Sequence, residues 1–154
     1  MPNTSQHHQH IREAIEIAKH SEERGNRPFG ALLIAADGSH LGSAGNTQSE
    51  DHQVLAHAEL NLLQSVTQQF SPEVLSQATL YTSAEPCPMC CGALFWAGIN
   101  HLVFGVSSAR LHEIQGFNPR SLKTSSREIL GSAGRSVEVV GPVLEAEAEK
   151  LFIS

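Results

Sequence analysis

This sequence of 154 residues has few cysteines, no long hydrophobic run and no excess of positive charge. Its apolar runs are as short as residues 31–36, whereas a transmembrane helix needs about 20 apolar residues, so we expect none. The first residues are polar and rich in histidine, which is not the pattern of a secretory signal peptide. Two of the three cysteines form a Cys-x-x-Cys pair, too few for a disulfide framework, and we therefore expect a cytoplasmic protein.

Positive charge is scarce and scattered along the chain. Lys and Arg total 10 against 16 Asp and Glu, which gives a formal net charge of −6. Proteins that bind nucleic acids usually carry a basic face that neutralises phosphates. The loose cluster of Arg120, Lys123 and Arg127 fits a solvated surface loop better than such a face. We therefore expect a small-molecule partner rather than a nucleic acid or a membrane.

Length and hydrophobic spacing predict a single α/β domain over 1–154, with 1–8 as a flexible tail. Helices are predicted at 6–24, 56–69, 86–97, 108–114, 126–133 and 145–152. Strands are predicted at 29–36, 40–47, 79–83, 102–106 and 137–140, and 115–126 is expected to be a surface loop. A helix, a hairpin and then alternating helices and strands imply a mixed sheet covered on both faces.

Two short motifs indicate a metal centre. His57-Ala58-Glu59 is followed thirty positions later by Cys87 and Cys90, which offer, with His57, three ligands for a tetrahedral zinc ion. Each motif opens a predicted helix, so two positive helix ends can meet around one ion and favour thiolates there. Three protein ligands leave one coordination position open, which distinguishes catalytic zinc from structural zinc.

The carboxylate of Glu59 is a candidate proton carrier beside the open coordination position. Water bound to zinc becomes acidic enough to supply hydroxide near neutral pH. Glu59 need not be a ligand, and it can take the proton from that water and deliver protons to a ring nitrogen and a leaving amine. The motifs therefore predict attack on an amino-bearing ring carbon, a tetrahedral centre and loss of ammonia.

Other interpretations of the cysteine pair were compared with this one. A redox pair would not require His57 and Glu59, and a structural zinc site would want a fourth ligand near by. The closest spare histidine, His52, falls in a predicted polar loop. Cys91 lies about 100° around the helix from Cys90, so we interpret it as a small buried hydrophobe.

The remaining histidines show no motif. His7, His8 and His10 are interpreted as part of the solvated tail, with at most adventitious metal binding. No role is predicted for His20, His40, His101 and His112.

Conspicuous motifs extend from Ile11 to Val106. They are Asn26-Arg27-Pro28-Phe29-Gly30-Ala31, Asn46, His57-Ala58-Glu59, Thr79-Leu80-Tyr81-Thr82-Ser83, Glu85-Pro86-Cys87-Pro88-Met89-Cys90, Gly92-Ala93, Trp96 and Val103-Phe104-Gly105. The chain thereby resembles the cytidine/deoxycytidylate deaminase superfamily, whose zinc members carry His-x-Glu and Pro-Cys-x-x-Cys. It is most similar to the branch of guanine deaminases, cytosine deaminases and tRNA adenosine deaminases. The resemblance implies a three-layer α/β/α fold with a five-stranded sheet, one zinc per subunit and usually a homodimer.

The resemblance also implies substrate contacts. Asn46 matches an asparagine that grips the base, and Phe29 matches an aromatic that lines the base pocket. Ala58 and Glu85 match positions whose backbone atoms border the substrate. Trp96 matches a tryptophan of bacterial guanine deaminases, although a core or dimer-face aromatic is an equal alternative.

Asn118 marks a departure from the guanine deaminases, which carry an acidic residue after a late Gly-Phe pair. Here Gly116-Phe117 is followed by Asn118, which could still hydrogen-bond a base. The sequence therefore favours a zinc-dependent hydrolytic deaminase of a free nucleobase or nucleoside, either guanine or a related aminated ring. Two alternatives stay open, a tRNA-specific adenosine deaminase and a non-catalytic protein that binds zinc or a base.

Overall fold

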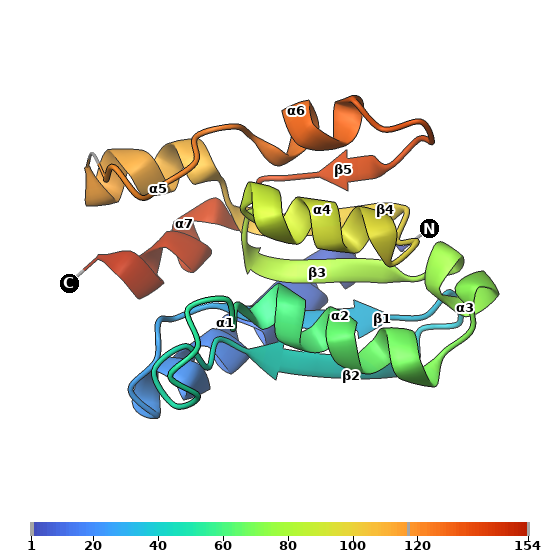
Figure 1. Cartoon of the computed structure of the whole chain (residues 1–154), viewed down its shortest axis with the longest axis horizontal. Coiled ribbons are helices and arrows are strands. Elements are labelled where there is room, and N and C mark those ends of the chain that lie inside the picture. Colours follow the sequence, from blue (N-terminus) through green and yellow to red (C-terminus); the bar gives the residue numbers. More distant parts are fainter. Residues whose placement is uncertain (1, 117, 154) are drawn as a thin grey trace.

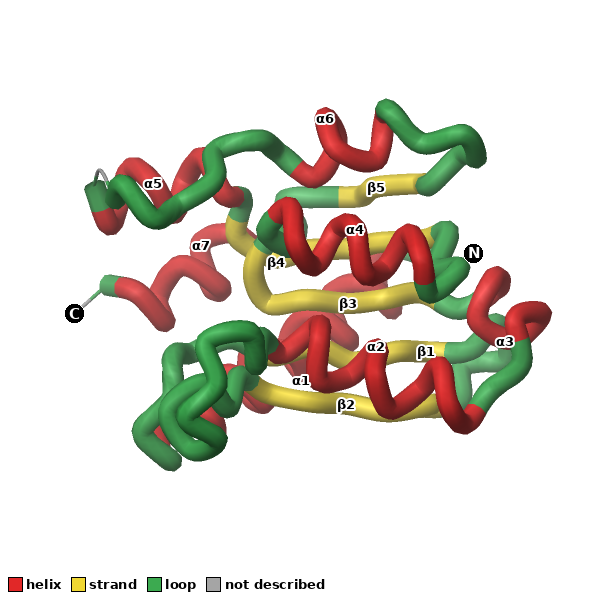
Figure 2. The backbone as a smooth tube through the Cα atoms, viewed as in Figure 1, coloured by secondary structure: helices red, strands yellow, loops and turns green. Residues whose placement is uncertain are grey.

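The computed structural model describes residues 2–116 and 118–153, and within them a five-stranded sheet forms the centre of the fold (Figures 1 and 2). The strand order is β2-β1-β3-β4-β5. Strand β1 pairs antiparallel with β2 and β3, whereas β3, β4 and β5 run parallel, so the sheet is mixed as predicted. The strands are β1 (Gly30–Ile34), β2 (His40–Gly45), β3 (Thr79–Ala84), β4 (His101–Val106) and β5 (Glu138–Val140).

Helices cover both faces of the sheet, which confirms the predicted three-layer α/β/α fold. In Figure 1, α2 (Ala58–Gln69) and α4 (Pro88–Trp96) lie in front of the sheet, and α1 (Thr4–Glu23) passes behind it. The other helices are α3 (Pro72–Gln77), α5 (Ser108–Gln115), α6 (Ser126–Gly131), α7 (Glu145–Ala148) and the 3₁₀ helix η1 (Glu149–Phe152). No helix among the described residues combines the length and the apolar character that crossing a membrane requires.

Alternate residues of each strand supply the two cores. Leu33 of β1 and Leu80 of β3 belong to the core under α2 and α4. Leu32, Ile34 and Tyr81 belong to the core under α1. All five residues of β1 are buried, because this strand has a helix layer on each side.

Helix α1 packs closely against β1 at Gly30. A Cβ atom at this position would lie 2.7 Å from the backbone nitrogen of Ala18 and closer still to the carbonyl oxygen of Ala14. A glycine therefore sets the distance between α1 and the sheet.

The expectation of a flexible tail at 1–8 is wrong from Thr4 onward. Asn3 caps α1, because its side chain accepts a hydrogen bond from the Gln6 N–H while the Gln6 side chain accepts one from the Asn3 N–H. His7 is buried, and its Nδ1 lies 2.8 Å from the hydroxyl oxygen of Tyr81. His10 is buried as well, so these two histidines belong to the helix layer and not to a solvated tail.

Several boundaries differ from the predicted ones. Ser71-Pro72, which we predicted only to end the preceding helix, also starts α3, because the Ser71 hydroxyl accepts the Val74 N–H and Pro72 occupies the first turn. Helix α2 begins at Ala58 rather than at 56, since His57 takes its N-cap position. The predicted terminal helix is divided into α7 and η1.

Candidate active site

Two helix N-termini meet at one end of the sheet. His57 is the N-cap residue of α2, and Cys87 is the N-cap residue of α4. Pro88 follows Cys87 in the first turn of α4, where a missing N–H costs nothing. The backbone is extended at both N-cap residues, so the chain changes direction there as each helix begins. The side chains of His57 and Cys87 lie close together at these two helix ends. The N-terminal dipoles of α2 and α4 both favour negative charge there.

The three predicted metal ligands converge. His57 Nδ1 lies 3.6 Å from Cys87 Sγ and 3.6 Å from Cys90 Sγ. Zinc bonds of about 2.3 Å to sulfur and about 2.05 Å to nitrogen, at a tetrahedral angle, place the two ligand atoms about 3.6 Å apart. The donor set therefore fits one face of a zinc tetrahedron, and these residues could hold a metal ion.

The thiols of Cys87 and Cys90 interact with each other and with His57. A hydrogen bond with Cys90, aided by His57, lowers the pKa of Cys87 to about 4 against the opposing effect of burial. The same bond and burial raise the pKa of Cys90. The Cys87 thiolate also raises the pKa of His57 through their hydrogen bond. The lowered pKa of Cys87 favours the thiolate form, which is the form that binds a metal cation.

Glu59 lies in the first turn of α2, two residues after His57. It is only 6% exposed, and burial raises the pKa of its carboxyl to about 7. A group with a pKa in this range can both accept and give up a proton near neutral pH. A carboxyl at this position could transfer protons, and the role of Glu59 as the proton carrier stays a prediction.

Cys91 is fully buried, and its thiol donates to the carbonyl oxygen of Pro86 at 3.4 Å. It takes no part in the cluster formed by His57, Cys87 and Cys90. Its prediction as a small buried hydrophobe is confirmed.

Phe29 and Asn46 lie next to each other at the end of the β1–β2 pair. The Asn46 N–H donates to the Phe29 carbonyl oxygen at 3.0 Å, directly beyond the paired residues Gly30 and Gly45. This is the sheet edge at which the parallel strands β3 and β4 end, and ligands of open α/β sheets bind at such edges. The Thr47 N–H bonds the Ala56 carbonyl oxygen at 3.0 Å, which ties this edge to the residue before His57.

The side chain of Asn46 is engaged within the chain. Its Nδ2 donates to Gln48 Oε1 at 2.8 Å, and its Oδ1 accepts the Gln48 N–H at 3.0 Å. Asn46 is 1% exposed, so a base could reach its amide only by exchange with Gln48.

Ala58 and Glu85 are near the cluster, but the carboxylate of Glu85 has a different task from the one predicted for its backbone. Glu85 Oε1 accepts the N–H and hydroxyl of Ser108, and Oε2 accepts those of Ser126. Burial opposes its ionisation, yet these hydrogen bonds prevail and lower the pKa of the Glu85 carboxyl. Glu85 thus anchors the first residues of α5 and α6 beside the loop that leads to Cys87. Ala58 is fully buried as the first residue of α2.

Trp96 lies away from the cluster, and the hydrogen bonds of Asn118 are with its own loop. Trp96 ends α4, nine residues beyond Cys87 and thus about 13 Å along the helix, and it is 85% exposed. Asn118 is exposed in a turn, where its side chain accepts the Arg120 N–H at 2.9 Å. Phe117, which precedes it, lies outside the described residues. The predicted role of Asn118 in substrate binding stays a prediction.

Sequence reasoning missed Phe152. Its ring lies 5.3 Å from that of Phe29, measured between ring centroids, so η1 packs against Phe29 at the sheet edge. The guanidinium of Arg27 lies 5.0 Å from the centroid of the Phe29 ring. The signal in the sequence was the apolar pair Leu151-Phe152, which follows the acidic segment 145–149 and could have indicated a buried contact.

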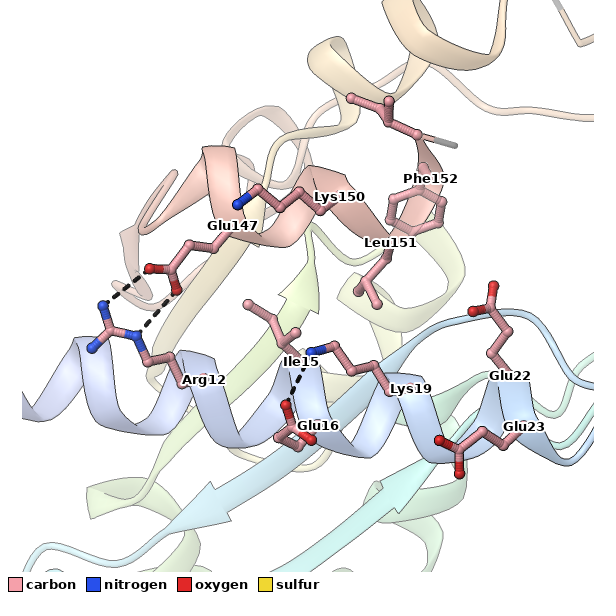
Figure 3. Close-up of a pocket in the computed structure, with 11 residues that line it drawn as sticks. Arg12, Ile15, Glu16, Lys19, Glu22, Glu23, Glu147, Lys150, Leu151 and Phe152 are labelled. Atoms are coloured by element: carbon pink, nitrogen blue, oxygen red, sulfur yellow. Dashed lines mark hydrogen bonds and ion pairs between the residues drawn. The ribbon is translucent and has the colours of Figure 1, made fainter.

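A groove of about 910 Å³ lies between α1 and the C-terminal segment (Figure 3). Charged side chains line it, and they pair across or along it as Arg12–Glu147 and Lys19–Glu16, each at 3.1 Å. None of His57, Cys87 and Cys90 lines this groove, so its size does not make it the reaction site.

Comparison with known proteins points to one family. The model of the cytidine and deoxycytidylate deaminase zinc-binding region matches residues 4–106. A probable cytosine deaminase of Schizosaccharomyces pombe is 39% identical over 142 residues, 90% of this chain and 85% of that protein. A tRNA-specific adenosine deaminase of Bacillus subtilis is 36% identical over 96 residues, 62% of this chain and 59% of that protein.

The fold is also similar to that of a known deaminase. A solved structure of the guanine deaminase from Nitrosomonas europaea superposes with a TM-score of 0.75 at 25% identity, covering 93% of this chain and 80% of that one. The similarity extends over the sheet and both helix layers, and the zinc-binding region of the family model contains both motifs of the cluster.

Proposed function

Because the chain belongs to the cytidine and deoxycytidylate deaminase family and is a hydrolytic deaminase, we propose that it removes the amino group of a free nucleobase or nucleoside. His57, Cys87 and Cys90 hold one zinc ion at this site, and Glu59 is the catalytic proton carrier. The substrate is an aminated purine or pyrimidine ring, with guanine and cytosine as the first candidates.

The observation that carries this proposal is the pair of 3.6 Å distances from His57 Nδ1 to the two sulfur atoms, next to a buried Glu59. Three converging donors leave one tetrahedral position for water or substrate. A carboxyl that is not needed as a ligand, buried beside that position, is the arrangement that proton transfer requires and a structural site does not.

The reaction adds water to the ring and releases ammonia. Zinc at this site, when bound, acidifies a water molecule and offsets the negative charge that develops on the attacking oxygen. Glu59 takes one proton from the water and passes it to the ring nitrogen beside the amino-bearing carbon. Glu59 then transfers the second proton of the water to the amino group, which leaves as ammonia, and the ring keeps the oxygen.

Phe29 and Asn46 are proposed to hold the ring. Phe29 offers an aromatic side chain at the sheet edge, where its ring packs against that of Phe152. The Asn46 amide carries a donor and an acceptor, and it exchanges its bonds to Gln48 for the edge of the base. Together they orient the amino-bearing carbon toward Glu59.

Charge supports a small substrate. Four cationic side chains are held by carboxylates of the same chain, at 2.5 to 3.1 Å: Arg12, Lys19, Arg24 and Arg110. With a net charge of −6, a surface of this kind attracts an RNA phosphate backbone poorly. Similarity to the Schizosaccharomyces pombe protein over 90% of the chain also supports a free base.

A panel assay for ammonia tests the substrate class. Zinc-loaded protein is incubated separately with cytosine, guanine, their nucleosides and deproteinised tRNA. We expect ammonia from at least one base or nucleoside and no inosine in the tRNA. Inosine in tRNA without ammonia from any small ring would overturn the proposal in favour of a tRNA-specific adenosine deaminase. A blank panel from protein that holds zinc would favour a non-catalytic zinc or base-binding protein.

We also propose a homodimer that covers the exposed end of α4. Trp96 is 85% exposed and stacks edge-on against Phe95 with ring centroids 5.6 Å apart, an aromatic pair of the kind that protein interfaces bury. Light scattering after size-exclusion chromatography should give twice the chain mass. Trp96→Ser should shift this mass toward that of one chain, and a monomeric wild-type protein would overturn the proposal.

A further inference from the structure

A second cluster of metal-type ligands lies on the opposite face of the sheet. It consists of His10 and Glu13 from α1 and His40 from the start of β2. His10 Nδ1 lies 3.0 Å from Glu13 Oε1, and His40 Nε2 lies 2.6 Å from Glu13 Oε2. All three donor atoms fall within 4.8 Å of one another. We refer to these residues as the His10 cluster.

The fold positions these ligands firmly. His10 and Glu13 are three residues apart on α1 and therefore share one face of the helix. His40 follows the turn in which Asp37 accepts hydrogen bonds from the N–H and hydroxyl of Ser39. His10 is 6% exposed and its ring lies 4.8 Å from that of Tyr81, between centroids, so packing fixes its orientation.

The chemistry of the cluster suits a divalent ion. Imidazole nitrogens with a carboxylate oxygen are typical ligands of zinc, nickel and other first-row metals. Burial opposes ionisation of Glu13, but hydrogen bonds with His40 and His10 prevail and lower the pKa of its carboxyl. The carboxylate oxygens of Glu13 and the two imidazole nitrogens thus face a point that His40, more than half exposed, leaves open to solvent.

We propose that His10, Glu13 and His40 form a second binding site for a first-row transition-metal ion, distinct from the His57 site. An ion there joins α1 to the edge strand β2, two elements that no disulfide links. The site contains no sulfur, so we expect it to bind zinc more weakly and more reversibly than the His57 site, where two thiolates contribute.

The competing interpretation is that His10, Glu13 and His40 form a hydrogen-bond network that holds no metal ion. Glu13 could accept hydrogen bonds from both histidines and need no ion. The two interpretations differ in a measurable way, because only a metal site adds a bound ion per chain and makes stability depend on metal concentration.

The test measures bound zinc in protein that carries no histidine tag. After equilibrium dialysis against excess zinc, mass spectrometry should find two zinc ions per wild-type chain and one per chain of His40→Ala. His57→Ala should keep the ion of the His10 cluster and lose the other. His20→Ala serves as the matched control, since it removes an exposed histidine of α1 that lies outside the cluster, and it should bind two.

Thermal unfolding provides the second readout. In protein whose His57 site already holds zinc, further zinc at about 100 times the dissociation constant of the His10 cluster should raise the melting temperature of wild-type protein by about 5 °C or more. This rise should vanish in His40→Ala and in Glu13→Gln. Melting curves recorded without added metal check that both variants fold. One zinc per wild-type chain, or two in His40→Ala, would overturn the proposal, as would an equal loss in His20→Ala.

Discussion

The two faces of the sheet present their ligands in different ways. Under α2 and α4, His57 and Cys87 occupy N-cap positions, so the ligands stand at helix ends where unpaired N–H groups favour thiolates. Under α1, His10 and Glu13 stand on the side of a helix, where no such field acts. The difference teaches that a helix end favours thiolate ligands through its N–H groups, whereas a helix side holds its ligands by side-chain packing and hydrogen bonds.

The largest effect is expected at Cys90. Cys90→Ala leaves two ligands at the His57 site, so zinc should be lost there and ammonia release should fall to background. Zinc content and turnover are measured on the same sample. Cys91→Ala is the matched control, since the neighbouring thiol bonds the Pro86 carbonyl and lies outside the His57 cluster, and it should keep both zinc and turnover. Equal loss in the two variants would contradict the assignment.

The largest change in the free energy of unfolding is expected for a substitution on the α1 face of the sheet. Gly30→Ala places a Cβ atom against the backbone of α1, and we expect it to lower the free energy of unfolding by about 3 kcal/mol. Gly92 of α4 has no atom within 4 Å of the position of an added Cβ, so Gly92→Ala should raise stability by roughly 0.5–1 kcal/mol. Urea denaturation checks both. A neutral Gly30→Ala would contradict the close approach.

A smaller stability effect is expected at Glu85. Glu85→Gln weakens the bonds to Ser108 and Ser126, and we expect a loss of about 2 kcal/mol at pH 7. The folded protein lowers the pKa of Glu85, so its ionised form stabilises above the unfolded pKa of about 4.3 and this contribution is lost as pH falls through the folded pKa. Denaturation at pH 7 and at acid pH should therefore show the difference from wild type shrink with acidity. A difference that grows would contradict the sign.

The smallest effect is expected for substrate binding at Trp96. Because this side chain is exposed at the far end of α4, Trp96→Ala should leave KM within about twofold of wild type. Steady-state kinetics on a preparation of known oligomeric state check this. A tenfold rise in KM in protein that keeps its wild-type mass would return Trp96 to the substrate site.

Much of the His57 site could be predicted from sequence because its determinants are local. Two motifs with fixed spacing, each before a helix, were sufficient to expect that His57, Cys87 and Cys90 converge. The order of a helix, a hairpin and then alternating helices and strands likewise predicted the mixed sheet and its two covered faces. These patterns depend on neighbours within a few positions along the chain.

The remaining features depend on contacts between distant segments. The bonds of Glu85 to Ser126, the packing of Phe29 on Phe152 and the approach of His40 to Glu13 each join residues far apart in sequence. No spacing rule encodes such contacts. Ser71-Pro72 shows a local limit as well, since the same dipeptide ends one helix and starts the next.

The most direct test of the deaminase site is Glu59→Gln, which keeps the shape of the side chain and removes its proton affinity. Because Glu59 lies outside the group formed by His57, Cys87 and Cys90, the variant should hold as much zinc as wild type, while kcat falls by about 10² to 10⁴-fold on the best substrate of the panel. Zinc content and kcat are measured together. A variant with full zinc and a kcat within tenfold of wild type would contradict the central claim that Glu59 carries the protons.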